Sequence, residues 1–94
     1  MELFTAISLL ESQQETKRFL RDLLTEAELK EFANRWKVAQ MLEKKIAYKD
    51  IERTTGMSST TIARIQKWLT NGMNGYKNML KKTNKNVTAH HLSI

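Results

Sequence analysis

A short stretch rich in hydroxyl side chains, followed by two bases, carries the chemistry that this sequence offers. It runs Ser58-Ser59-Thr60-Thr61 and continues to Arg64 and Lys67. Small hydroxyl side chains permit close approach to base edges and bond phosphates, and an arginine can bind guanine or clamp a backbone phosphate. The free amides at the start of a helix would add a phosphate site. The pattern therefore predicts a surface that binds double-stranded DNA.

Two short helices, over 48–55 and 58–69, would position these side chains as a helix-turn-helix. Gly56 can adopt the left-handed conformation that ends a helix, and Ser58 can cap the next helix by accepting from an amide at residue 60 or 61. Lys49 and Arg53 on the first helix would contact the phosphates beside the major groove. The two helices would share a small core through four apolar residues spaced around Gly56, namely Ile51, Met57, Ile62 and Ile65.

Two other interpretations of this segment stay open. A short helix, a glycine and a short helix are also ordinary bundle architecture, and Glu52 stands where many helix-turn-helix units carry a small residue. That departure predicts looser or differently rotated packing. The unit could also be a protein-interaction module whose basic face docks an acidic protein partner. The hydroxyl-rich face favours DNA, because the cores of protein interfaces recruit aromatic residues and Met.

Helical periodicity extends over the rest of the chain. Leu3, Phe4, Ile7 and Leu10 predict a helix over 2–11, Ser12 caps a second helix, and Thr25 caps a long third helix that ends near residue 45. We expect residues 1–46 to be dimerisation helices, 74–80 to be a C-terminal helix, and 81–94 to be a mobile basic tail. The fold class is therefore all-α, a single helical domain over 1–80.

Charge is divided unevenly along the chain. The 94 residues carry 16 Lys and Arg against ten Asp and Glu, a formal net charge of +6. Residues 1–34 hold four bases and seven acids, whereas residues 35–94 hold twelve bases and three acids. The first part has a net charge of −3 and the second of +9. A basic segment of this kind is typical of polyanion binding, although charge alone would also suit a merely solvated surface.

Composition excludes several classes of protein. The chain is too short for most catalytic folds, and no nucleophile, acid–base pair or glycine-rich phosphate loop accompanies its carboxylates, so we predict that it is not an enzyme. The absence of cysteine excludes disulfides and predicts a cytoplasmic protein. No run is long and apolar enough to cross a membrane. His90 and His91 lack a third ligand, so no metal site is expected. Trp36 and Trp68 fall on apolar stripes and are expected in the core or in a dimer interface.

From about Leu24 to Leu69 the chain resembles the Trp-repressor-like family, and specifically its YerC/YecD branch. The resemblance rests on Leu24-Thr25, Asn34-Arg35, Asp50-Ile51 and the run from Gly56 to Ile65. It implies an intertwined homodimer that presents two recognition helices to successive major grooves of an operator. The implied function is a sequence-specific transcriptional regulator, expected to be a repressor.

The resemblance also implies where a corepressor would bind. In Trp repressors it lies between two arginines and near a threonine, and the matching positions are Thr25, Arg35 and Arg64. Tryptophan-binding members carry glycine after the second arginine, where this chain has Ile65, whose side chain would fill the space of the indole. We therefore predict no tryptophan cofactor, and expect a different small-molecule effector or none.

Overall fold

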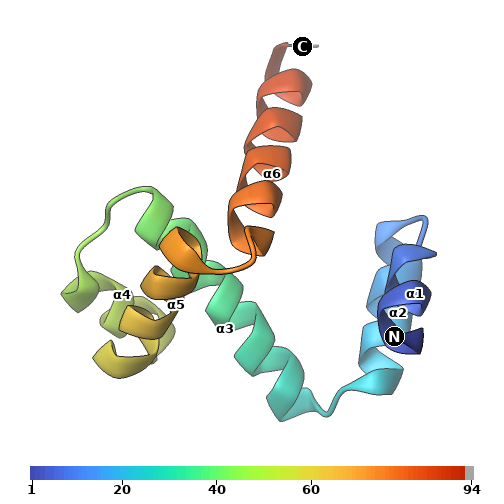
Figure 1. Cartoon of the computed structure of the whole chain (residues 1–94), viewed down its shortest axis with the longest axis horizontal. Coiled ribbons are helices and arrows are strands. Elements are labelled where there is room, and N and C mark those ends of the chain that lie inside the picture. Colours follow the sequence, from blue (N-terminus) through green and yellow to red (C-terminus); the bar gives the residue numbers. More distant parts are fainter. Residues whose placement is uncertain (93–94) are drawn as a thin grey trace. The chain divides into compact units, whose positions relative to one another are not determined.

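The chain folds into helices throughout the part that is described. A computed structural model describes the backbone of residues 1–92 and the side chains of residues 1–84. It contains six α-helices and, within those residues, no strand (Figure 1). They are α1 (Glu2–Ser8), α2 (Gln13–Leu23), α3 (Glu26–Glu43), α4 (Tyr48–Thr55), α5 (Ser59–Asn71) and α6 (Gly75–Leu92). The predicted all-α fold class is confirmed.

Two compact units make up the chain. The first covers residues 1–33 with α1, α2 and the start of α3, and the second covers residues 34–94 with the rest of α3 and α4 to α6. The chain is thus divided near the point where its net charge changes sign. The helix-turn-helix lies wholly in the second unit.

Hydroxyl side chains set three of the helix starts. The Ser12 Oγ accepts from the Glu15 amide at 3.0 Å, and the Ser58 Oγ accepts from the Thr61 amide at 3.2 Å. At Thr25 the bonds are reciprocal, since Thr25 Oγ1 accepts from the Glu28 amide at 3.1 Å and the Glu28 carboxylate accepts from the Thr25 amide at 2.9 Å. These bonds satisfy amides that have no partner inside a helix, so the three starts fall where the sequence predicts them.

The hydrophobic core lies in the second unit. Ile51, Ile62 and Ile65 are completely buried, and Met57 packs against them, so the predicted core of the helix-turn-helix is confirmed. Helices α3 and α6 also contribute buried side chains to this core. The remaining buried residues are Val38, Ala39, Met41, Leu42, Leu69 and Leu80. Glu52 is exposed and takes no part in this core.

Apolar side chains of the first unit stay largely in contact with solvent. Phe4 is 66% exposed and Leu9 is 68% exposed, and Leu3, Ile7 and Leu23 are also exposed. Phe19 and Leu20 on α2 are half-buried, and no residue of α1 or α2 is buried. Exposed apolar side chains are what an interaction site would use when they lie together on a surface.

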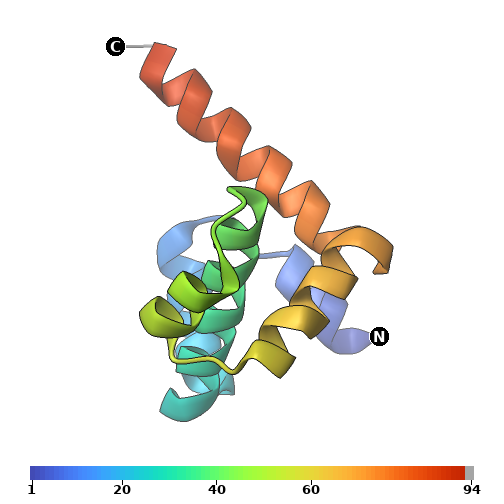
Figure 2. The same cartoon turned by 90° about the vertical axis from the view of Figure 1, so that its left-hand side faces the viewer.

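The last helix is longer than the sequence predicts. We expected it over 74–80 with a mobile tail from 81, but α6 continues from Gly75 to Leu92, so the prediction that the helix ends at 80 is wrong (Figures 1 and 2). Residues 81–92 have little apolar periodicity, yet Lys, Asn, Thr and Ala are all compatible with a helix once a packed turn precedes them. Residues 93–94 of the predicted tail lie outside the described residues.

None of the helices described in this structure is long and apolar enough to span a bilayer.

Candidate nucleic-acid interface

A tight turn at Gly56 joins α4 to α5. Gly56 has φ 73° and ψ 5°, the left-handed conformation, and its amide donates to the Glu52 carbonyl at 2.8 Å. The Thr55 hydroxyl donates to the Ile51 carbonyl at 2.8 Å and accepts from the Met57 amide at 3.2 Å. The backbone of the turn is therefore held by its own hydrogen bonds, which fixes where α5 begins.

The two sides of α5 have different compositions. Ile62, Ile65 and Leu69 are buried in the core that α5 shares with α3, α4 and α6, whereas Ala63, Arg64 and Lys67 are exposed. Ser58, Ser59 and Thr60 at the start of the helix are also exposed, and Thr61 is half-buried. The structure thus places six of the eight residues predicted for DNA contact at the start of α5 or along it, and all of them except Thr61 are exposed.

No acidic residue occupies the first turn of α5. By contrast, Glu15 lies in the first turn of α2, Glu26 and Glu28 in that of α3, and Asp50 in that of α4. An acid at this position normally neutralises the positive end of the helix dipole. The first turn of α6 shares this absence, and in α5 it leaves the positive end of the helix dipole without an acidic side chain of its own, which suits an external anion such as a phosphate.

The other two predicted DNA contacts lie on α4. Lys49 and Arg53 are both exposed. The Arg53 guanidinium lies 3.5 Å from the Asp50 carboxylate, one turn earlier on the same helix. Both side chains are more than half exposed, so the pair contributes little to stability and can open when a stronger anion approaches.

The residues that the resemblance assigns to a corepressor have other contacts. The Thr25 hydroxyl caps α3 in the first unit. In the second unit, the Arg35 guanidinium lies over the ring of Trp68, 5.9 Å from its centroid, and Arg64 is exposed on α5. Ile65 is completely buried in the core, so its side chain fills space that a glycine would leave empty.

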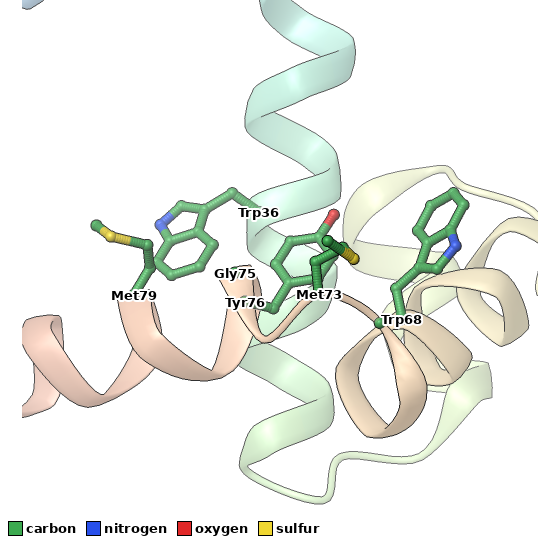
Figure 3. Close-up of a pocket in the computed structure, with 7 residues that line it drawn as sticks. Trp36, Trp68, Met73, Gly75, Tyr76 and Met79 are labelled. Carbon is green, nitrogen blue, oxygen red and sulfur yellow. The ribbon is translucent and has the colours of Figure 1, made fainter. Parts of the chain in front are cut away.

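An apolar groove of about 500 Å³ was not anticipated from the sequence. It is lined by residues from α3, α5, α6 and the link between the last two: Trp36, Trp68, Gly72, Met73, Gly75, Tyr76 and Met79. In Figure 3, Tyr76 and Met73 lie between the two indoles. Trp36 is half-buried against the core, as predicted, but Trp68 is 43% exposed. The groove could not be inferred from spacing, because its walls are far apart in the sequence.

Burial in this region affects one ionisable group. Desolvation raises the pKa of the Tyr76 phenol, while the nearby positive charge of Arg35 acts in the opposite direction. Among the residues with described side chains, no three His, Cys, Asp or Glu come together as a metal site. His90 and His91 lie outside that range.

Comparisons with known proteins agree with this geometry. Residues 1–84 match the family model described as Trp repressor protein. The chain is 36% identical over 87 residues to the uncharacterized protein YerC of Bacillus subtilis (strain 168), with 93% of this chain and 84% of that protein covered.

Two solved structures have the same fold. A TrpR like protein from Eubacterium eligens ATCC 27750 superimposes with a TM-score of 0.82 at 34% identity, over 88% of this chain and 86% of that one. A candidate Trp repressor from Staphylococcus aureus gives a TM-score of 0.81 at 36% identity, over 88% and 83%. The chain therefore belongs to the Trp repressor protein family, a family of DNA-binding helix-turn-helix regulators.

Proposed function

We propose that this protein is a dimeric, sequence-specific repressor that reads the major groove with α5. The observation that carries the proposal is the division of α5 into a fully buried apolar side and an exposed side of hydroxyls and bases. A helix in the major groove needs an outer side without bulky apolar residues, a start that accepts phosphate, and a few side chains that reach base edges. The exposed residues from Ser58 to Lys67 support each of these requirements, and the exposed Trp68 follows them, one turn beyond Arg64.

The residues divide into two roles. Arg64 lies on the exposed side of α5 and is the candidate for base contact, since a guanidinium binds guanine through two hydrogen bonds. Lys67, Lys49 and Arg53 would bind phosphates and set the orientation of the protein on the duplex. The exposed hydroxyls of Ser59 and Thr60, in the first turn of α5, would bond a phosphate or a base edge.

A second copy of the chain would complete the regulator. The exposed apolar side chains of α1 and α2 have no buried core of their own, and packing against a partner would remove them from water. A dimer would carry two copies of α5, and its operator would have two half-sites about one helical turn apart. Ile65 fills part of the core, which supports the proposal that tryptophan is not the effector.

Selection from a pool of random duplexes, followed by fluorescence anisotropy, tests the proposal. Enrichment of a palindrome with half-sites about 10 base pairs apart is expected. Binding should weaken steeply with salt, because log K falls by ~0.9 per neutralised phosphate per decade of salt concentration. A flat salt profile, or no binding to any duplex, would overturn the proposal and favour an acidic protein partner instead.

Two variants distinguish the roles of the basic residues Arg64 and Lys67. Arg64→Ala should reduce operator affinity by about tenfold and relax the preference at one base position, since a bidentate base contact contributes ~1–3 kcal/mol. Lys67→Ala should weaken binding to all sequences alike and lower the salt slope by about one. The same loss of affinity for operator and random duplex in both variants would show that Arg64 does not read a base.

A further inference from the structure

A contact outside the hydrophobic core joins α3 to α5, the helix proposed to enter the major groove. The Arg35 guanidinium on α3 lies over the indole of Trp68 on α5, at 5.9 Å from the ring centroid. Arg35 is half-buried and Trp68 is 43% exposed. A guanidinium within about 6 Å of an indole face is attracted by the negative charge density of the ring. The contact therefore links α3 and α5 at a point where no buried side chain does so.

The core residues of α5 hold the helix along one side. Its three buried residues, Ile62, Ile65 and Leu69, form a single stripe along the helix. A helix that is packed along one stripe can roll about it unless a side chain beside the stripe is also held. Trp68 is such a side chain, and it lies one turn after Arg64 on the same side of α5. Any rotation that displaces Trp68 therefore displaces Arg64 as well.

The other surroundings of Trp68 offer less restraint. On one side the indole borders the open groove, where Met73 is 96% exposed and Met79 is exposed. Where the chain leaves α5, the Gly72 amide donates to the Trp68 carbonyl at 2.9 Å. A side chain at Gly72 would collide with that carbonyl oxygen. The backbone of Trp68 is thus fixed by the end of α5, while Arg35 provides the contact from α3 that holds its ring.

We propose that Arg35 and Trp68 form a brace that fixes the angle of α5 against α3, which makes Trp68 a positioning residue for DNA recognition. The proposal rests on the proposed function, in that α5 is taken as the reading helix. The brace acts on base recognition through Arg64 and does not itself touch DNA. Both side chains of the brace, Arg35 and Trp68, belong to the same polypeptide chain.

A double-mutant cycle on DNA binding tests the brace. Trp68→Leu and Arg35→Gln should each weaken binding to the selected operator by about fivefold, as expected for losing one cation–π contact. The double variant should lose about the same fivefold, because either change already breaks the contact. Trp68→Phe, which keeps a ring beneath the guanidinium, should recover most of the loss.

Two readouts separate positioning from a general loss of structure or charge. The salt slope for Trp68→Leu should equal that of the unaltered protein, since no phosphate contact is lost. Met79→Leu, which changes the same groove from α6, should leave operator affinity unchanged and serves as the matched control. Fold-changes that multiply in the double variant would overturn the proposal, as would an equal loss for Met79→Leu.

A distance measurement tests the brace even without DNA. The chain has no cysteine, so Lys37→Cys on α3 and Lys67→Cys on α5 can carry a pair of spin labels at two exposed positions. The distance distribution should broaden in Trp68→Leu and in Arg35→Gln, with no further broadening in the double variant. An unchanged distribution would overturn the brace. Failure of the unaltered protein to bind any duplex, with broadening still observed, would overturn only the proposed function.

Discussion

The indole of Trp36 on α3 and the phenol ring of Tyr76 on α6 lie stacked, with centroids 6.4 Å apart and planes 11° from parallel. The pair joins the first turn of α6 to α3, and both rings line the apolar groove. Because the Tyr76 ring is partly removed from water, the ionised phenolate is disfavoured in the folded protein.

Stability should therefore fall in alkaline solution in a way that depends on Tyr76. Burial raises the pKa of this phenol, so its contribution is fully present below the unfolded pKa of about 10 and is lost as pH rises through the folded pKa. Urea unfolding at a series of pH values should show this decline, and Tyr76→Phe should reduce it. Parallel pH profiles for the two proteins would show that Tyr76 does not ionise as a buried group.

The three glycines should respond differently to the same substitution. Gly56→Ala should destabilise the protein by ~1–2 kcal/mol, because φ is positive although there is open space for a Cβ. Gly72→Ala should be more harmful, since the added carbon would collide with the backbone of Trp68. Gly75→Ala meets nothing and should be neutral or stabilising by ~0.4–1 kcal/mol, as measured by thermal or urea unfolding. A loss at Gly75 as large as that at Gly56 would contradict this explanation.

Removing one carboxylate should tighten DNA binding. Asp50 lies 3.5 Å from the Arg53 guanidinium and would compete with a DNA phosphate for it. Asp50→Asn should raise affinity for duplex by up to about fivefold at low salt, and the gain should shrink as salt is added. Glu43→Gln, which removes the same charge at the exposed end of α3, is the control and should have a smaller effect. Equal gains from both variants would mean that only net charge matters.

Thr25 should prove to be a structural residue. Thr25→Ala removes the acceptor that caps α3 and should cost about 1 kcal/mol of stability, which Thr25→Ser should restore. The hydrogen bonds from Thr25 lower the pKa of Glu28, so the contribution of Glu28 is present above its unfolded pKa and is lost as pH falls through the folded pKa. Glu28→Gln should flatten this acid decline. If Thr25→Ala left the free energy of unfolding unchanged, capping would not explain the presence of Thr25. The corepressor role implied by the family resemblance would then be the better explanation.

Many features of the fold are determined by side chains that lie close together in the sequence. Ser12, Thr25 and Ser58 each satisfy an amide of the helix that follows, and Gly56 supplies the one conformation that the turn requires, so these boundaries follow from the sequence. The spacing of Ile51, Ile62 and Ile65 likewise identifies the core of the helix-turn-helix. Such features depend on residues within a few positions of one another.

The features that the sequence does not reveal depend on distant residues. The groove exists because α3, α5 and α6 meet, and no spacing links Trp36 to Met79. The exposure of Trp68 and its position beneath Arg35 depend on the angle between α3 and α5, and the two residues are 33 positions apart in the sequence. The length of α6 was not predicted for another reason. Residues 81–92 have no apolar stripe at helical spacing that would indicate a helix.

The separation of buried and exposed residues on α5 has a consequence for how this family diversifies. Ser59, Thr60, Ala63, Arg64 and Lys67 contribute nothing to the core, so their replacement leaves the free energy of folding nearly unchanged. For a helix that reads DNA as proposed, a lineage could therefore acquire a new operator through single substitutions, without first acquiring compensating changes elsewhere. Ile62, Ile65 and Leu69 do not have that freedom, and among relatives they should change far more slowly than the residues beside them.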